Sequence, residues 1–393
     1  MDKDLYFDTV IAGCGVGGLF TALHLPASQH VLMICKEDLE SCNSMLAQGG
    51  ICVLRSDDDY DEYFEDTMRA GHYENRKESV DIMLRSSRSV INQLLDYGVD
   101  FERNPDGSLA YTREGAHRHP RICFHEDTTG KEITTKLQAA VKKLPNVEIM
   151  EYTTMTDVLV EDGVCTGMIA ETREGDRLLI HTHDTVMATG GIGGLYEHST
   201  NFRCLTGDAL EVSKKHGVQL DHLDYVQIHP TSLYTGKPGR AFLISESTRG
   251  EGAILLDAKG ERFVDELLPR DVVANAIFEQ MKKDGTEYVR LSFENIPEEE
   301  IRGHFKNILA TCLEEGYDIT KEPIPVVPAQ HYFMGGVHVD SDSQTTMPHL
   351  YAVGETSCNG VHGKNRLASN SLLESLVFGE RAAAHIAETR KGN

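Results

Sequence analysis

The chain has 393 residues, of which 40% are hydrophobic and 25% are charged, and its formal net charge is -24 at pH 7. A chain of this length has enough apolar side chains for one large globular domain or two ordinary ones. The acidic excess makes nucleic acid and anionic membrane surfaces unfavourable partners, because both would repel the protein. An anionic substrate is not excluded, since screening over about 8 Å leaves the potential inside a pocket to a few local side chains.

Membrane segments and cysteine chemistry add little to this picture. The sequence has no uninterrupted apolar run of about 18 residues, and its start carries Asp2, Lys3 and Asp4 instead of an apolar leader. We therefore expect a cytoplasmic protein. The nine cysteines are an odd number and form no CxxC pair, which argues against a disulfide framework and against zinc or iron–sulfur ligand sets. We expect no bound metal and mostly buried free thiols.

A glycine-rich turn lies close to the start of the chain. Residues 8–12 are typical of a short strand, and a helical leucine pattern follows the turn. The turn reads Gly13-Cys14-Gly15-Val16-Gly17-Gly18. In dinucleotide-binding folds, such glycines permit a tight turn, close approach of the pyrophosphate and packing of helix on strand. The sequence predicts a nucleotide-binding turn here, with a purely structural glycine turn as the alternative.

The usual acidic ribose ligand is less clear. After the expected second strand, residues 30–35, its position carries Lys36, and Glu37 and Asp38 lie just beyond. The residue that contacts the ribose therefore stays open.

The middle of the chain indicates one domain interrupted by another. Residues 156–161, 165–172 and 178–182 alternate as hairpin strands, and residues 185–189 form a buried strand that ends in glycines. A further apolar strand at residues 350–355 indicates a return to the nucleotide-binding sheet. Between them, polar loops and short strands surround two expected helices, at residues 272–283 and 298–314.

We therefore expect an α/β fold with a discontinuous architecture. A Rossmann-like domain, residues 1–222 and 337–393, is interrupted by an α+β capping domain, residues 223–336.

The segment of residues 360–374 combines glycines, an arginine and an expected helix start. Glycines let backbone approach a ligand closely, and Ser369, Asn370 or Ser371 can cap a helix from residue 371 to about residue 386. The free N–H groups of a helix start attract negative charge, as does Arg366. The segment predicts an anion-binding turn, and a structural turn with a helix cap is the alternative.

Several motifs together resemble the L-aspartate oxidase family, within the wider group of fumarate reductase and succinate dehydrogenase flavoproteins. They are the glycine turn and residues 44–50, 188–191, 206–208, 227–231, 249–252, 269–271, 331–336 and 360–374. The resemblance covers residues 7–386 and implies a GR2-type flavoprotein fold with FAD. Relatives commonly continue into a C-terminal helical domain, which we expect this chain to lack.

The resemblance also implies a reaction. L-Aspartate would be oxidised to iminosuccinate, with oxygen or fumarate as the electron acceptor. Iminosuccinate would pass to quinolinate synthase, so that the reaction is the first step of quinolinate and NAD biosynthesis.

By resemblance, FAD contacts six parts of the chain. The implied contacts are Gly13, Cys14, Gly15, Val16, Gly17, Gly18, Lys36, Asn43, Ser44, Met45, Leu46, Ala47, Gln48, Gly49, Gly50, Asp208, Glu355, Ser371 and Leu372. Membrane-complex relatives attach FAD covalently through a histidine five residues before the glutamine of the AQGG motif, and here that position is Asn43. We therefore expect noncovalent FAD.

The implied substrate contacts suit an amino dicarboxylate. His229, Ser245, His331 and Arg366 match the family positions that bind two carboxylates, and a guanidinium fork fits a carboxylate well. Glu114 matches the glutamate that selects the substrate's amino group, because a carboxylate attracts an ammonium. The alternative is that Glu114 is a surface acid paired with a neighbouring arginine, Arg113 or Arg118.

The implied catalytic residues are Arg270, Glu246 and His229. By resemblance, Arg270 donates or accepts a proton. Because arginine normally stays protonated, it would act in a relay with Glu246 or Asp271, or stabilise developing charge. Glu246 would hold His229 or Arg270 in place.

Two other functions stay open. A soluble fumarate reductase or succinate dehydrogenase type flavoprotein would use the same residues, although Glu114 and the absence of CxxCH haem motifs argue against it. A catalytically silent flavin-binding protein would keep the glycine turn, but Arg270, His331 and Arg366 are all present.

Overall fold

Five short strands form a parallel sheet beneath the glycine turn. The computed structural model describes residues 2–237 and 239–391. The strand order is β17-β10-β2-β3-β6. The strands are β2 (Thr9–Ala12), β3 (Val31–Ile34), β6 (Val147–Met150), β10 (Asp184–Met187) and β17 (Leu350–Ala352). All four neighbouring pairs are parallel, and β2, β3, β10 and β17 are buried at every residue, as in a parallel sheet covered on both faces.

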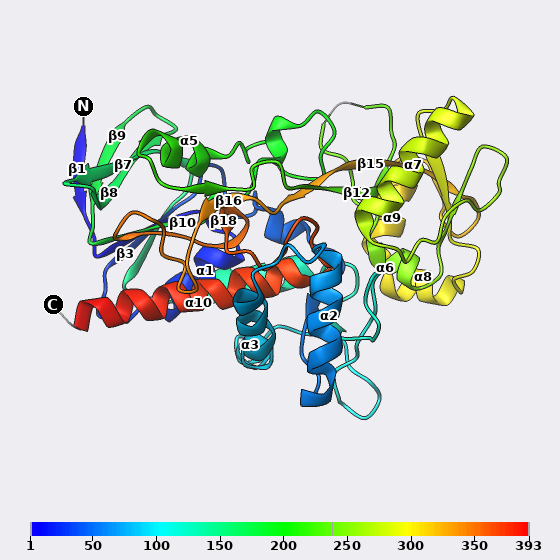
Figure 1. Cartoon of the computed structure of the whole chain (residues 1–393), viewed down its shortest axis with the longest axis horizontal. Coiled ribbons are helices and arrows are strands. Elements are labelled where there is room, and N and C mark those ends of the chain that lie inside the picture. The colour runs from blue at the N-terminus through cyan, green and yellow to red at the C-terminus, as the bar shows by residue number, and fades with distance from the viewer. Residues whose placement is uncertain (1, 238, 392–393) are drawn as a thin grey trace.

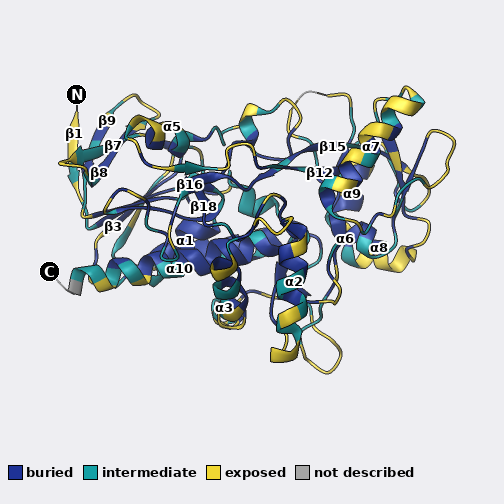
Figure 2. Cartoon of the chain, viewed as in Figure 1, coloured by how far each residue is buried: buried dark blue, intermediate teal, exposed yellow. Residues whose placement is uncertain are grey.

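Helices α1 (Val16–His24) and α10 (Asn370–Lys391) pack closely against each other. A Cβ added to Gly379 would lie 2.8 Å from the backbone oxygen of Gly17, so glycine on α10 permits this approach. Figure 2 shows the N-terminal half of α10 buried among the other elements, and residues 372–379 are all buried. Further helices of this part are α2 (Tyr60–Ala70), α3 (Lys77–Asp96), α4 (Thr129–Val141) and α5 (Asp208–Lys215). The expected helix that begins near residue 371 is confirmed and extends beyond residue 386.

Smaller sheets flank the parallel sheet. The expected hairpin strands are confirmed, two with longer bounds and the third shifted by one residue, in a sheet of order β1-β9-β8-β7. Its strands are β1 (Lys3–Tyr6), β7 (Thr153–Glu161), β8 (Val164–Thr172) and β9 (Arg177–His181). A three-stranded sheet contains β11 (Leu220–Asp221), β16 (Gly336–His338) and β18 (Ser357–Cys358), and a two-stranded sheet contains β4 (Ile51–Cys52) and β5 (Ile122–Cys123).

A separate antiparallel sheet lies in the middle of the chain, with order β12-β15-β14-β13. Its strands are β12 (Val226–Leu233), β13 (Ile254–Leu256), β14 (Val289–Ser292) and β15 (Ile324–Phe333). With α6 (Glu246–Gly250), α7 (Arg270–Asp284), α8 (Glu298–His304) and α9 (Lys306–Glu314), it surrounds a hydrophobic core of its own. Figure 1 shows β12 and β15 leading into this lobe, which is coloured yellow-green. The division at residues 223 and 336 stays a prediction.

The single helix expected at residues 298–314 is wrong. The structure has two helices, α8 and α9, which meet at Phe305, where the backbone leaves the helical region at φ -109° and ψ 41°. The break buries the Phe305 ring completely. It also frees the amides of Asn307 and Ile308, which donate to the carboxylate of Asp127 at 3.1 and 2.6 Å. A partner far away in the sequence thus caps the second helix.

Within the described residues, no helix is both long and apolar enough to cross a membrane. All nine cysteines are free, and seven of them are buried.

Candidate active site

One cavity of about 540 Å³ contains all the site residues that the sequence predicts. Its walls come from the glycine turn, residues 43–50, the ends of β10 and β17, the start of α10 and the neighbouring face of the β12–β15 sheet. A cavity of this size is typical of small-molecule and cofactor sites. The residues that the sequence predicts for the site therefore line one cavity, while their individual roles stay predictions.

The glycine turn gives the cavity a floor without side chains. Gly13 has φ 120°, and a Cβ added to it would lie 1.9 Å from the backbone oxygen of Ala188 at the end of β10. A Cβ on Gly18 would lie 2.1 Å from the oxygen of Gly13, so this glycine permits the contact of α1 with the turn. The N-terminus of α1 follows directly and favours negative charge. The turn therefore suits a pyrophosphate.

Lys36, the residue at the expected ribose position, is paired with acidic and polar neighbours. Its Nζ donates to Asp208 Oδ1 at 3.0 Å and to Thr206 Oγ1 at 2.8 Å. Asp208, which is far away in the sequence, therefore brings a carboxylate to this end of the cavity. The fold thus places the carboxylate of Asp208, one of the implied FAD contacts, next to the expected ribose position.

Two other predicted cofactor contacts have polar atoms ready for a ligand. Gln48 donates to the backbone oxygen of Leu243 at 2.8 Å, but its buried Oε1 has no partner among the described residues. Glu355 accepts from the amide of Phe333 at 3.0 Å, and burial raises its pKa to about 7. Buried polar atoms need partners, so these groups fit a ligand with many hydroxyl and amide groups.

Two histidines on the neighbouring strands β12 and β15 lie edge to face in the wall of the cavity. The rings of His229 and His331 are 5.1 Å apart between centroids. Burial, followed by the Arg270 charge, lowers the pKa of each well below its ordinary value, so both are neutral near pH 7. His229 Nδ1 lies 3.2 Å from the amide nitrogen of Thr231 and 3.0 Å from its carbonyl oxygen, so the Thr231 backbone can pair with this nitrogen in either tautomer. The buried Nε2 has no partner in the described chain, so it is available for a hydrogen bond with a ligand.

Arg366 adds a positive charge from the segment before α10. Its guanidinium lies over the Tyr332 ring, 4.5 Å from the centroid, and its Nη1 donates to Ser371 Oγ at 3.0 Å. Burial lowers its pKa to about 10, an effect to which Arg270 adds, and it remains charged at neutral pH. Its buried Nε lacks a partner among the described residues, so part of its fork is free to bind a carboxylate.

Arg270 and Glu246 form a buried ion pair at the starts of α7 and α6. Arg270 Nε donates to Glu246 Oε2 at 2.5 Å, and Arg270 Nη1 donates to Gln227 Oε1 at 2.9 Å. Burial by itself would raise the pKa of Glu246, but the charges of Arg270 and Arg249 outweigh it and hold the pKa below its ordinary value. Glu246 therefore contacts Arg270 and stays ionised.

The other expected relay acid lies elsewhere. Asp271 Oδ2 is 3.0 Å from His72 Nε2, and both side chains are partly exposed. The geometry thus favours Glu246 over Asp271 as the acid beside Arg270.

Two residues outside the predicted site complete this ion pair. Gln227 bridges Arg270 to the segment before α10, because its Nε2 donates to the backbone oxygen of Arg366 at 2.8 Å. Arg249 is fully buried, with its Nη2 3.8 Å from Glu246 Oε2. Both belong to motifs that carry the family resemblance, residues 227–231 and 249–252, but only the fold shows what their side chains contact.

Glu114 lies inside the cavity and not on the surface. It is 3% exposed, and it accepts a hydrogen bond from the hydroxyl of Ser369. Burial, and then the charge of Glu246, raises its pKa. Arg118 pairs with Asp66 instead. The alternative of a surface acid paired with Arg118 is therefore wrong.

Glu374 on α10 provides a test of the protonation state of a buried carboxyl. It is 1% exposed, accepts from Asn359 and Ser375, and burial raises its pKa from 4.5 to about 7. The unfolded chain releases this proton at lower pH, so the folded state binds more protons between about pH 4.5 and 7. Stability contributed by the neutral carboxyl is therefore lost as the pH rises through this window.

We accordingly expect Glu374→Gln to melt near the wild-type temperature at pH 5 and several degrees above it at pH 8. Thermal unfolding at both pH values measures this, with the exposed Glu171→Gln as a control. An equal shift at both pH values would contradict a buried neutral carboxyl.

Comparison with known proteins identifies the family. A family described as FAD binding domain matches residues 8–372. The L-aspartate oxidase of Clostridium perfringens is 48% identical over 380 residues, which cover 96% of this chain and 86% of that protein. The chain belongs to the L-aspartate oxidase family. The enzyme of that name from Bacillus subtilis is 40% identical over 386 residues, covering 96% of this chain and 71% of the relative.

The solved structures agree with the family fold. A quinol fumarate reductase from E. coli aligns with a TM-score of 0.92 and 31% identity, covering 100% of this chain and 72% of that one. The expected flavoprotein fold is therefore confirmed. The cofactor is FAD, and the bare glycine turn and the unpartnered Gln48 oxygen fit it. The amide of Asn43, which accepts from the Phe202 N–H at 3.1 Å, is consistent with noncovalent binding.

Proposed function

We propose that the chain oxidises L-aspartate to iminosuccinate with noncovalent FAD, and that oxygen or fumarate reoxidises the flavin. The observation that carries the proposal is the buried carboxylate of Glu114 in the same cavity as the unpartnered nitrogens of His229 and Arg366. Donors suit the two carboxylates of the substrate, and an acid suits its ammonium. The family relationship at 48% identity supports the same substrate.

Binding would hold both carboxylates of the substrate before any bond changes. His229 and His331 come from the paired strands β12 and β15 of the capping lobe, and Ser245 precedes α6 in the same lobe. Arg366 lies over the ring of Tyr332, which follows His331. A neutral histidine can donate a hydrogen bond to a substrate carboxylate and still keep its proton. Holding both carboxylates fixes the orientation of the α-carbon, which lowers the entropic part of the barrier.

The reaction removes a hydride from the α-carbon and a proton from the amine. FAD, when bound, supplies the two-electron acceptor for the hydride. Glu114 attracts the ammonium, and its raised pKa brings it closer to the range in which a carboxylate can hold a proton. Ser369, which donates to Glu114, limits the orientations of that carboxylate.

Arg270 would stabilise charge beside the reacting carbon and move a proton only together with Glu246. The 2.5 Å contact between the two side chains supports a shared proton path, and the charges of Arg270 and Arg249, which both approach Glu246 Oε2, keep that acid ionised. Gln227 holds Arg270 next to Arg366. Electrostatic stabilisation by a fixed guanidinium needs no deprotonation, so both roles are compatible with this geometry.

Glu114→Gln tests the choice of substrate. We expect the ratio of kcat/KM for L-aspartate to that for succinate to fall at least about tenfold, because the amide loses a charge-assisted contact with the ammonium. Steady-state assays with each substrate measure the ratio. Glu171→Gln, an exposed change on β8, should leave it unaltered. An unchanged ratio in Glu114→Gln would remove this residue from substrate selection.

The cellular setting is also a proposal. Nine free thiols suit a reducing compartment, which supports a cytoplasmic protein. Iminosuccinate is a reactive imine, so transfer to quinolinate synthase would limit its loss to water.

A further inference from the structure

The loop that carries Glu114 has no regular secondary structure to hold it. It leaves the bridge between Thr112 and Ile122, and Ala116 adopts φ 66°, a conformation that side chains rarely adopt. A buried carboxylate on such a loop needs external support to keep one position. The amide of Ala116 donates to the backbone oxygen of Leu267 at 3.0 Å, but this contact lies beside Glu114 and does not reach its carboxylate.

The support comes from a buried charge network on the opposite side of the loop. Arg121, whose exposed fraction is 0%, donates to Asp66 Oδ2 at 2.9 Å and to Asp59 Oδ1 at 2.7 Å. Asp66 also accepts from the amide of Arg118 at 2.9 Å. The C-terminal part of the loop is thereby tied to helix α2 and to the turn that precedes it.

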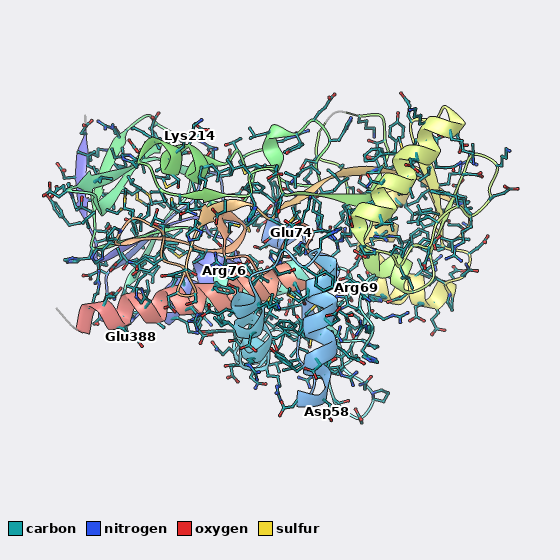
Figure 3. The ribbon with its side chains drawn as sticks, viewed as in Figure 1. Asp58, Arg69, Glu74, Arg76, Lys214 and Glu388 are labelled. Atoms are coloured by element: carbon teal, nitrogen blue, oxygen red, sulfur yellow. The ribbon has the colours of Figure 1, made fainter. Side chains whose placement is uncertain are left out.

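Arg69 adds a tie near the middle of the loop. Its Nη2 donates to the backbone oxygen of Ala116 at 2.8 Å. Figure 3 shows Arg69 near the end of α2 that lies toward the start of α10, with Asp58 at the opposite end of the helix. The contact of Tyr63 on α2 with Asn370 at the start of α10, at 2.8 Å, agrees with this arrangement.

His117 connects this network to the cavity. Its Nδ1 is 3.1 Å from Arg121 Nη1, and its Nε2 is 3.0 Å from the backbone oxygen of Ala368. A guanidinium only donates, so Nδ1 accepts and the proton lies on Nε2, which donates to Ala368. Burial, and then the Arg121 charge, lowers the pKa of His117 to about 4, and the ring therefore stays neutral in this single tautomer.

Ser369 links this network to Glu114. It follows Ala368 directly, has φ 61°, and donates its hydroxyl to Glu114. The carboxylate of Glu114 lies so close to Gly49 that a Cβ there would be 2.2 Å from Oε1. Small rotations of residues 368 and 369 would therefore move the acid relative to the predicted flavin contacts.

We propose that His117 and Arg121 are positioning residues, which fix Ala368 and Ser369 and thereby hold the Glu114 carboxylate where it recognises the substrate's ammonium. The inference rests on the proposed function of Glu114. It assigns amine selection to a buried histidine and arginine that do not touch the substrate themselves.

The test uses His117→Gln in the FAD-loaded full chain. The glutamine amide can still donate to Ala368 but loses the contact with Arg121. We expect the L-aspartate concentration that half-saturates anaerobic flavin reduction to rise about tenfold. The limiting rate and the inhibition constant of succinate should each change less than about threefold, since succinate lacks the amine. His119→Gln, on the same loop but exposed and paired with Glu62, is the matched control.

Other results would overturn the proposal. Equal weakening of L-aspartate binding and succinate binding would indicate a merely structural role. An unchanged half-saturation would show that His117 does not position Glu114. His117→Asn, which keeps the acceptor for Arg121 and loses the donor to Ala368, should move the half-saturation in the same direction. If neither variant retains FAD, the network belongs to the fold and not to selection. A wild type that L-aspartate does not reduce would instead contradict the proposed function.

Discussion

Arg270→Leu is expected to slow anaerobic flavin reduction by L-aspartate at least about a thousandfold, while the purified protein stays yellow. The substitution removes the positive charge beside Glu246 and leaves that buried carboxylate without its 2.5 Å partner. It does not touch the glycine turn or residues 43–50, so FAD binding should persist. Stopped-flow absorbance of the oxidised flavin band measures the rate.

The exposed Arg290 on β14 provides the control for this substitution. Arg290→Leu removes the same charge from the capping lobe at a distance from the cavity and should reduce at the wild-type rate. A near-normal rate in Arg270→Leu would exclude Arg270 from the reaction. Loss of FAD in Arg270→Leu would instead show that the residue supports the cofactor site.

Gly13→Ala is expected to yield protein that carries little or no FAD. The new Cβ would lie 1.9 Å from the backbone oxygen of Ala188, and φ 120° is a conformation that alanine disfavours. The clash is with backbone in the central sheet, so the turn or β10 must shift, at a cost of at least about 3 kcal/mol. The ratio of flavin absorbance to protein absorbance, together with thermal unfolding, measures both effects.

Gly163→Ala separates the clash from the backbone strain. Gly163 also has positive φ, 81°, in the turn between β7 and β8, but an added Cβ would meet nothing within 4 Å. We expect this variant to lose only about 1 kcal/mol and to keep its FAD. Full FAD content in Gly13→Ala would contradict the fit between the glycine turn and the cofactor.

Much of the fold could be predicted because local patterns agree with the final structure. The glycines after β2 permit a tight turn of the backbone, and the alternation of buried and exposed residues along β7 and β8 follows from the geometry of a strand. The one wrong helix, residues 298–314, broke because Asp127 caps the amides of Asn307 and Ile308 from another part of the chain. No local pattern contains that partner.

The same limit applies to the site. Motifs predicted which residues meet in the cavity, including Glu114, Arg270 and Arg366. They did not predict that Gln227 joins the two arginines, because its contacts span 43 and 139 positions in the sequence. Hydrogen bonds over such separations depend on the packed fold, and residue type alone does not reveal them.

The most direct test of the central claim is anaerobic mixing of the FAD-loaded protein with L-aspartate, succinate or D-aspartate, one at a time. The absorbance of the oxidised flavin band reports reduction in each case. We expect L-aspartate to bleach the band and D-aspartate to leave it unchanged, with succinate far slower than L-aspartate. Bleaching by succinate alone, or by none of the three in protein that holds FAD, would contradict the proposed oxidation of L-aspartate.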